Sequence, residues 1–253
     1  MWINVAVGTF GLWTAVVATG GFGRPTVTGI VLFALAGLIG TVGGRIFRFV
    51  SIEKVGPSIS AALTNLHPLV ATALAILLLG EHVTLPVVAG TMIIVLGTVL
   101  LSLGNQGRTG FKTWHLALPL GSAVCFGTVA ILRKLGLGHV GVIVGSAINV
   151  TTAFVAYTAF MIAAGRGRAM IGDRSGFGWF LAAGVAENSS VFLNVVALGL
   201  GTVSVVSPLV GSSPIFVLLL SFLYLRGAEV LTARIIVGTL LTVVGVVLIT
   251  ISR

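Results

Sequence analysis

Long apolar runs, separated by short breaks, dominate the chain. Each run covers about twenty residues, and the breaks contain glycine, proline or charged residues. An α-helix needs about 20 apolar residues to cross the hydrocarbon core of a bilayer. The pattern predicts nine such helices, at residues 2–21, 27–48, 55–79, 84–104, 114–134, 140–164, 177–199, 202–225 and 231–251.

These runs are continuously apolar and do not alternate between apolar and polar positions. A strand of a membrane barrel alternates over about ten residues. Helices and closed barrels are the two architectures that satisfy every backbone polar group in lipid. The pattern therefore predicts an all-α integral membrane protein.

Composition supports the bilayer as the main solvent. Of the 253 residues, 57% are hydrophobic and 8% are charged, and the mean hydropathy is +1.19. An ordinary soluble domain has about 25% charged residues. The five acidic residues are too few to keep a soluble fold of this size dispersed. We therefore expect a multi-pass protein of the cell membrane, with the lipid bilayer as a partner.

The net charge of +9 reflects fourteen Lys and Arg residues. They lie in ones and twos between apolar runs and form no basic stripe, so we expect no nucleic-acid partner. By the positive-inside rule they place the N-terminus in the cytoplasm and the C-terminus outside. Residues 1–4 lack a basic region and lead directly into an apolar run, which predicts a span and no removable signal peptide.

Residues 55–104 and 201–252 share an ordered set of landmarks. Pro68 and Pro214 lie 146 residues apart. Later pairs lie 148 residues apart, namely Glu81 with Glu229, Thr84 with Thr232, Gly90 with Gly238, and Gly97 with Gly245. The matching helices are the third and the eighth, and this odd offset inverts the unit in the membrane. We expect two inverted repeats, 1–104 with four transmembrane helices and 114–253 with five, as is typical of carriers.

The order Pro68, Leu79-Gly80-Glu81 and Gly97 resembles the EamA-type repeat of the drug/metabolite transporter superfamily. The resemblance covers nearly the whole chain, and it is looser in the second copy, at Arg226-Gly227-Ala228-Glu229. It implies a carrier of small metabolites, amino acids or drugs, built from two five-helix halves, with a cytoplasmic C-terminus, whereas the positive-inside rule places the C-terminus outside. Against that pattern the first half lacks its first helix, either because the start is assigned too late or because the protein has nine spans.

Glycines recur every seven residues at 90, 97 and 104, and again at 238 and 245. Residues seven apart share one face of a helix. Each of these helices should therefore present a smooth face to a neighbouring helix, and this face is also a candidate for a homodimer contact.

Glu187 lies near the centre of the seventh predicted span, next to Asn188. An ionised carboxylate at mid-bilayer costs about 2.5–3.5 kcal/mol on insertion scales. Glu187 is therefore a candidate for proton coupling or substrate binding, or else a neutral acid that bonds a neighbouring helix. Arg45, inside the second span, is a candidate partner for Glu187 or for an anionic substrate, unless it reaches the head groups.

Two prolines interrupt the third and eighth spans at matching places. Because proline has no N–H, Pro68 and Pro214 leave the carbonyls of Thr64 and Val210 without their helical donors. Polar side chains lie beside them, namely Asn65, His67, Ser212 and Ser213. Facing each other, these groups would line a central cavity, and the alternative is a pair of kinks required for packing.

Asn149, Tyr157 and Trp13 are further candidates for the substrate site. A lone polar residue in a membrane helix more often bonds a neighbouring helix. The histidines show no metal-ligand spacing, and Cys125 is the single cysteine, so we expect no metal, cofactor or disulfide.

These observations favour a secondary-active transporter of small organic solutes that works by alternating access, with efflux and proton coupling as open options. No Walker-type nucleotide-binding motif occurs, so the energy would come from a gradient. Motifs of intramembrane proteases and hydrolases are also missing, and we expect no catalytic residues. The alternatives are an intramembrane enzyme, or a channel or non-transporting scaffold.

Overall fold

The computed structural model describes residues 2–21, 23–102, 112–165, 177–224 and 233–251. Every regular element within these ranges is a helix, which confirms the predicted all-α class. The predicted residues Gly104, Glu229 and Thr232 lie outside the described ranges.

Among the described residues, seven helical segments are long and apolar enough to cross a membrane. They are Trp2–Thr19, Val27–Val55, Pro57–Leu79, Thr113–Leu137, Val142–Ala163, Phe177–Leu200 and Ala233–Ile251. Two shorter apolar segments, Leu85–Leu101 and Val203–Phe216, fall on the remaining predicted spans. The chain is therefore a multi-pass helical membrane protein, and the count of nine spans stays a prediction.

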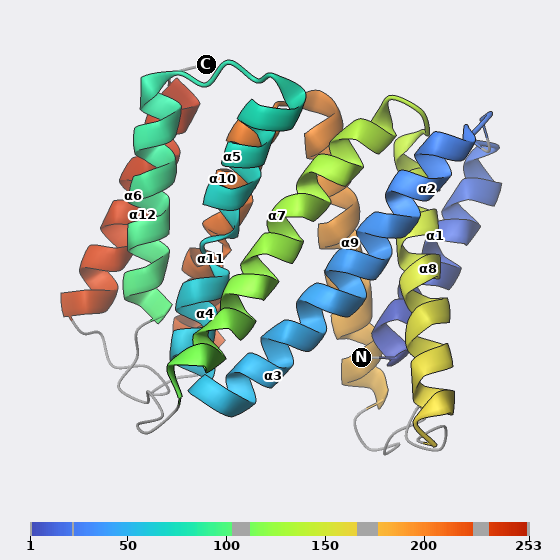
Figure 1. The fold of residues 1–253 in the computed structure, drawn as a ribbon, viewed down its shortest axis with the longest axis horizontal. Helices are drawn as coiled ribbons and strands as arrows, with labels where there is room; N and C mark the ends of the chain where they lie inside the picture. The colour runs from blue at the N-terminus through green and yellow to red at the C-terminus, as the bar shows by residue number, and fades with distance from the viewer. Residues whose placement is uncertain (1, 22, 103–111, 166–176, 225–232, 252–253) are drawn as a thin grey trace. The chain divides into compact units, whose positions relative to one another are not determined.

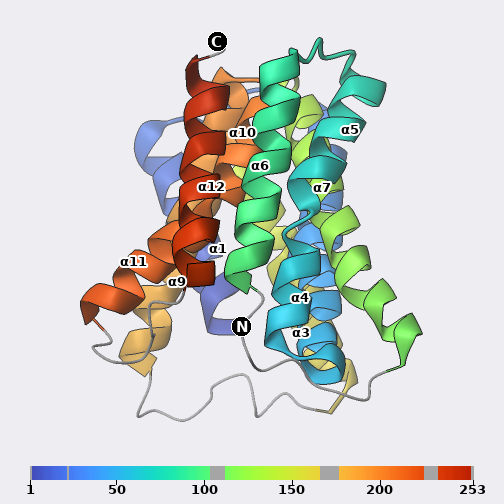
Figure 2. The ribbon, with the colours of Figure 1, turned by 90° about the vertical axis from the view of Figure 1, so that its left-hand side faces the viewer.

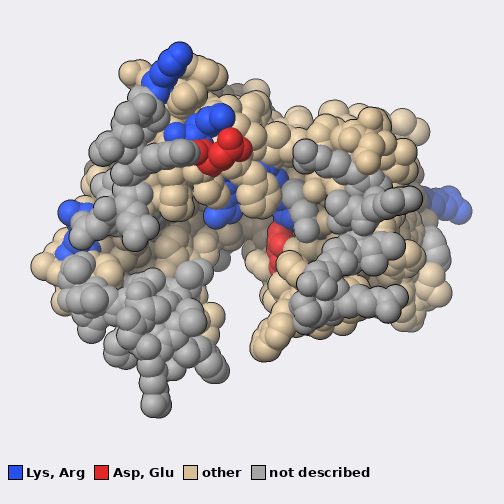
Figure 3. All heavy atoms as spheres, turned by 90° about the horizontal axis from the view of Figure 1, so that it is seen from below, with Lys and Arg blue, Asp and Glu red and all other residues tan. Residues whose placement is uncertain are grey.

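The helices form two compact units. Unit 1 contains Met1–Gly43 and Val129–Gly201, and unit 2 contains Gly44–Thr128 and Thr202–Arg253. Each predicted repeat contributes segments to both units, so the repeat boundaries at 1–104 and 114–253 stay a prediction. On the face shown in Figure 3, the described charged side chains occupy small separate areas and form no continuous patch.

Unit 1 is built around a packed group of long helices. It contains α1 (Trp2–Thr19), α2 (Val27–Ala36), most of the π-helical segment η1 (Gly37–Gly44), the end of α7 (Ala117–Leu137), α8 (Val142–Ala163) and α9 (Phe177–Leu200). Helix α1 packs on α8 and α9 (Figure 1). The Trp2 indole donates to Thr158 at 3.0 Å and the Trp13 indole donates to Thr151 at 2.8 Å, so α1 and α8 run antiparallel.

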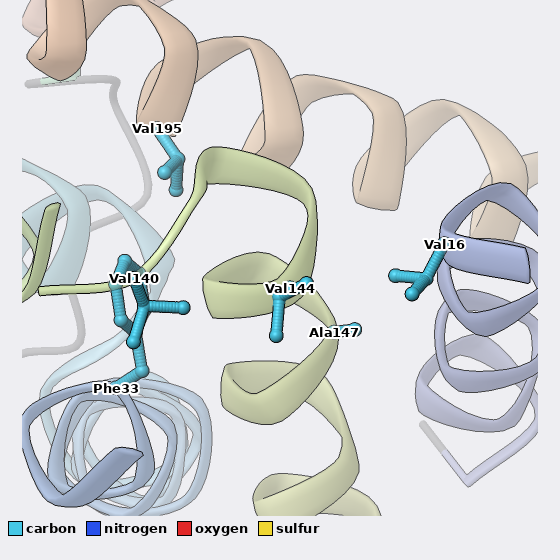
Figure 4. Close-up of a cluster of buried hydrophobic side chains, with 6 residues drawn as sticks. All are labelled: Val16, Phe33, Val140, Val144, Ala147 and Val195. Carbon is cyan, nitrogen blue, oxygen red and sulfur yellow. The ribbon is translucent and has the colours of Figure 1, made fainter. Parts of the chain in front are cut away.

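The core of unit 1 surrounds Phe33, which is fully buried. Its cluster also includes Val16, Val140, Val144, Ala147 and Val195 (Figure 4). A Cβ at Gly136 would lie 2.8 Å from the Phe33 ring, and a Cβ at Gly145 would lie 2.4 Å from it. Glycine at both positions therefore makes room for the ring.

Unit 2 contains the interrupted helices and the two glycine-spaced helices. Its elements are α3 (Arg45–Val55), α4 (Pro57–Thr64), α5 (His67–Leu79), α6 (Leu85–Ser102), the 3₁₀ turn η2 (Thr113–Leu116), the start of α7, α10 (Val203–Gly211), α11 (Ser213–Tyr224) and α12 (Ala233–Ile251). Helix α6 lies beside α12 along its length (Figures 1 and 2).

The two predicted glycine faces pack against each other. A Cβ at Gly90 would lie 2.9 Å from the Gly245 carbonyl oxygen, and one at Gly245 would lie 2.7 Å from the Gly90 oxygen. Gly97 and Gly238 show the same reciprocal approach, at 2.6 and 2.9 Å. The neighbour of each glycine face is therefore the other one, and the pairing shows that α6 and α12 run antiparallel.

The second predicted span was placed too short. We expected it to end near residue 48, but the helix continues through Lys54 to Val55. Charged residues such as Arg48 and Lys54 are good helix formers, so they end the apolar run without ending the helix. Arg45 consequently lies ten residues before the end of α3, where we expected about one turn.

Lys134 caps the end of α9 in unit 1. Its ammonium donates to the carbonyl oxygens of Leu198 at 2.8 Å and Gly201 at 2.7 Å. The carbonyls at a helix C-terminus lack intrahelical donors and carry partial negative charge. The lysine thus satisfies two groups at the point where the chain leaves unit 1.

Glu81 caps the start of α10 in unit 2. Its carboxylate accepts from the backbone N–H groups of Val203 at 2.8 Å and Ser204 at 2.9 Å. The side chain of Thr202, at the N-cap position, makes no capping hydrogen bond. Glu81, which follows the end of α5, therefore supplies from another helix the negative charge that a helix N-terminus favours.

Gly97→Ala should lower the free energy of unfolding by about 1–3 kcal/mol, the usual range for overpacking. The added methyl group would lie 2.6 Å from the Gly238 oxygen and 2.8 Å from the Thr242 nitrogen, and backbone atoms cannot swing aside. Gly11→Ala is the matched control, because a Cβ there meets nothing within 4 Å. Thermal unfolding in detergent measures both variants, and equal melting temperatures would contradict the close contact between the glycine faces of α6 and α12, which we call the α6–α12 seam.

Glu81→Gln should lower the free energy of unfolding by about 0.5–2 kcal/mol, because it removes the charge at the N-terminus of α10. The control is Glu53→Gln, since Glu53 is exposed and forms a 3.1 Å surface ion pair with Lys54. Such pairs contribute little to stability. Chemical denaturation of the two variants compares them, and equal losses would show that the cap adds nothing.

Candidate functional site

Both predicted proline interruptions are present in unit 2. Helix α4 ends at Thr64 and α5 begins at His67, and α10 ends at Gly211 and α11 begins at Ser213. Each proline is the second residue of the later helix. The backbone therefore leaves its regular hydrogen bonding at the same place in the two matching segments.

The carbonyl freed by Pro68 has a side-chain partner. The Nδ1 atom of His67 lies 3.2 Å from the Thr64 oxygen, so the tautomer that carries hydrogen on Nδ1 donates to it. The His67 ring also meets the edge of Phe126, with ring centroids 6.3 Å apart. His67 thus fills part of the break, and Asn65 beside it is half-buried.

The two breaks meet where α5 packs on α10. A Cβ at Gly211 would lie 2.8 Å from the Cγ atom of Pro68, and both residues are buried. Close to the break, the hydroxyl of buried Ser212 donates to the Leu209 oxygen at 2.6 Å. Ser213 is exposed and Pro214 is half-buried. The structure therefore brings Pro68 to the second break, and a cavity shared by the two breaks stays a prediction.

Two buried hydroxyls near the first break have no hydrogen-bond partner among the described residues. They belong to Thr64 and Thr72, on either side of the interruption. Buried hydroxyls are usually paired. This part of unit 2 therefore carries hydrogen-bonding capacity beyond what its own packing uses.

Glu187 joins α9 to α1 in unit 1. The Asn4 amide donates to the Glu187 carboxylate, and the Asn188 amide donates to the Asn4 carbonyl at 2.9 Å, the Asn4 side-chain oxygen at 3.1 Å and the Gly184 carbonyl at 2.7 Å. Gly8 lies directly against Asn188, where a Cβ would clash. Sequence reasoning missed Asn4, because it stands at the start of an apolar run.

A half-open groove of about 450 Å³ lies beside this polar link in unit 1. Helices α1 and α9 form its two sides, with Ile143 of α8 between them. The lining is apolar apart from Asn188 and Ser189. Glu187 does not line it, so the groove and the acid are separate features of the same helix pair.

Other candidates take separate positions. Arg45 is half-buried in unit 2 and Glu187 belongs to unit 1, so their pairing stays a prediction. Trp13 bonds Thr151 and joins α1 to α8, in agreement with the packing alternative. Tyr157 is half-buried on α8.

Arg133 is a buried cation that sequence reasoning grouped with the charges between the apolar runs. It is 9% exposed, and its Nε and Nη1 atoms donate to the side-chain oxygens of Asn149 at 3.2 Å and Asn194 at 3.3 Å. The misreading arose because the span was predicted to end at residue 134, whereas α7 continues to Leu137. Asn149, a predicted candidate, is thus part of a polar contact among α7, α8 and α9.

Comparisons with known proteins agree with this architecture. The EamA-like transporter family matches residues 1–103 and 113–251. An uncharacterised protein of Methanocaldococcus jannaschii is 33% identical over 76 residues, and the match takes in 30% of this chain and 56% of that protein. A solved crystal structure superposes with a TM-score of 0.77 at 20% identity, over 100% of this chain and 88% of the other, and shows the same fold. The chain belongs to the EamA-like transporter family.

Proposed function

We propose that the chain is a secondary-active carrier of small organic metabolites that works by alternating access in the cell membrane. The observation that carries the proposal is the contact between two interrupted helices at Pro68 and Gly211. Interrupted helices expose polar backbone inside a membrane protein, and carriers use such breaks to bind solutes near the midplane. Membership of a transporter family favours this function over an intramembrane enzyme.

The glycine contacts support an inverted arrangement of the two repeats. The offset of 148 residues relates Gly90 to Gly238 and Gly97 to Gly245. When each residue of the contact between Gly90 and Gly245 is replaced by its match, the result is the contact between Gly238 and Gly97. The structure contains both contacts. Two antiparallel helices related by a two-fold axis in the membrane plane have this property.

Two other pairs of matching segments support the same arrangement. The first predicted span contains α1 and its match in the second repeat contains α8, and these helices are antiparallel. Helices α5 and α10, from the third and eighth spans, are antiparallel as well. The start of α5, at Pro68, meets the end of α10, and Glu81 beyond the end of α5 meets the start of α10.

Glu187 is our proposed proton-coupling group. It hydrogen-bonds Asn4 on a different helix, so gain or loss of its proton alters the contact between α9 and α1. A neutral acid costs far less at membrane depth than an ionised one. A change of protonation can therefore be linked to a change in helix packing.

Counterflow in proteoliposomes tests the carrier function. Vesicles that hold the purified protein are preloaded with unlabelled amino acids, sugars or organic anions, and uptake of the labelled compound is followed. A carrier should show uptake that saturates and that accelerates with the same solute inside. Linear uptake without this acceleration would indicate a channel, and no uptake of any solute would indicate a scaffold.

Glu187→Gln should remove the dependence of uptake on an imposed pH gradient and leave counterflow in place, because exchange needs no net proton movement. The reason is that glutamine keeps the hydrogen bond to Asn4 but does not titrate. Glu53→Gln is the control, because that acid is exposed at the end of α3. Unaltered proton dependence in the Glu187 variant would remove the coupling role.

A further inference from the structure

A cluster of buried polar side chains lies between helices α7, α8 and α9 in unit 1. The Arg133 cluster consists of Arg133 on α7, Ser146 and Asn149 on α8, and Asn194 on α9. Ser146 and Asn149 are fully buried, and Arg133 is 9% exposed. Asn149 is seven residues from the start of α8, which places it about 10 Å along the helix.

The hydrogen bonds of Arg133 fix how the amides are turned. Both asparagines present their side-chain oxygen to the guanidinium. The Asn149 amide nitrogen therefore points elsewhere, and it is buried with no hydrogen-bond partner among the described residues. The Ser146 hydroxyl is also buried with no hydrogen-bond partner among the described residues. Residues three apart lie on one face of a helix, so two unused groups stand side by side on α8.

Unused buried polar groups are uncommon and need a reason. Each one gives up its hydrogen bonds to water and gains none within the protein, which destabilises the fold. Here the helices also approach closely, because a Cβ at Gly37 would lie 2.2 Å from the Asn149 carbonyl oxygen. The chain thus keeps two unsatisfied groups inside tight packing, which is a feature that functional sites tolerate.

The unused groups of the cluster can both donate hydrogen bonds. The Asn149 amide nitrogen is a donor only, and the Ser146 hydroxyl can donate as well. The two asparagine oxygens already accept from Arg133. The charged residues among the described residues of unit 1 are three cations, Arg24, Arg133 and Lys134, and one acid, Glu187. This excess of positive charge also favours an anion as the ligand.

We propose that the Arg133 cluster binds the oxyanion group of an organic acid, a carboxylate or a phosphate. This inference rests on the proposed carrier function and names its substrate class. An oxyanion accepts several hydrogen bonds and donates none, so it suits a donor-only amide nitrogen beside a hydroxyl, next to the positive charge of Arg133. An ammonium group offers no acceptor to that amide nitrogen.

The described conformation seals both unused groups from solvent, since neither the Asn149 amide nitrogen nor the Ser146 hydroxyl is accessible. A solute reaches them when the neighbouring helices separate. Alternating access supplies such a movement.

Thermal shift on the detergent-purified full chain tests the site. The probes are sodium benzoate, succinate and phosphate at matched ionic strength, with benzamide and succinamide as uncharged controls. A ligand that binds only the folded state raises the melting temperature. We expect at least one of the anions to raise it and both amides to leave it unchanged.

Asn149→Ala and Ser146→Ala should each raise the anion concentration needed for half of that shift by about tenfold, which corresponds to one lost hydrogen bond to a charged group. Thr152→Ala is the matched control, because the Thr152 hydroxyl on α8 already donates to the Ile148 oxygen at 2.9 Å. If Asn149→Ala does not fold, Ser146→Ala decides the question, since it removes one oxygen atom.

The inference is wrong if no anion shifts the unmodified protein, or if the Ser146 and Asn149 variants respond like Thr152→Ala. Its failure can be told apart from failure of the carrier function. Saturable counterflow of uncharged solutes with no response to anions would remove the anion site and keep the carrier. An anion response that the variants lose, in a protein without counterflow, would keep the site and remove the carrier.

Discussion

Close backbone contact between α6 and α12 is the constraint on which the account depends. Lipid gives apolar helices no hydrophobic reason to associate, so their contact needs short distances between many atoms. Gly90, Gly97, Gly238 and Gly245 allow backbone to meet backbone, with carbonyl oxygens in the place that a side chain would take. The contact holds the last helix of one predicted repeat against the last helix of the other. Each of the two glycine faces therefore packs on the other one within a single chain.

The interrupted helices of unit 2 place polar backbone groups within an apolar bundle. An interruption leaves polar backbone that lipid cannot satisfy, so it must lie against protein or face a cavity. Here Pro68 meets Gly211, His67 takes up one freed carbonyl, and Glu81 caps the helix that contains the second break. Lys134 makes the complementary cap at the end of α9. Among the described residues, Glu81 and Lys134 thus place charge at helix ends, and Arg133 and Glu187 bond named polar side chains of other helices.

Sequence predicted the features that depend on local chemistry. The positions of the helices follow from continuous apolar runs, the interruptions follow from the missing N–H of Pro68 and Pro214, and the glycine faces follow from a seven-residue spacing. Sequence missed features that require several helices at once. Arg133 was grouped with the charges between the apolar runs because its partners, Asn149 and Asn194, are distant in the chain. The cap formed by Glu81 could not be foreseen, because its acceptor role depends on where α10 begins in space.

The most direct test of the account asks whether α6 and α12 run in opposite directions across the membrane. Single cysteines at Leu85, at the start of α6, and at Ile251, at the end of α12, would be introduced after Cys125→Ser removes the native thiol. Both positions are exposed. If α6 and α12 are antiparallel, an impermeant thiol reagent labels both cysteines from the same side of sealed vesicles. Labelling from opposite sides would contradict the antiparallel α6–α12 seam and, with it, the inverted repeats.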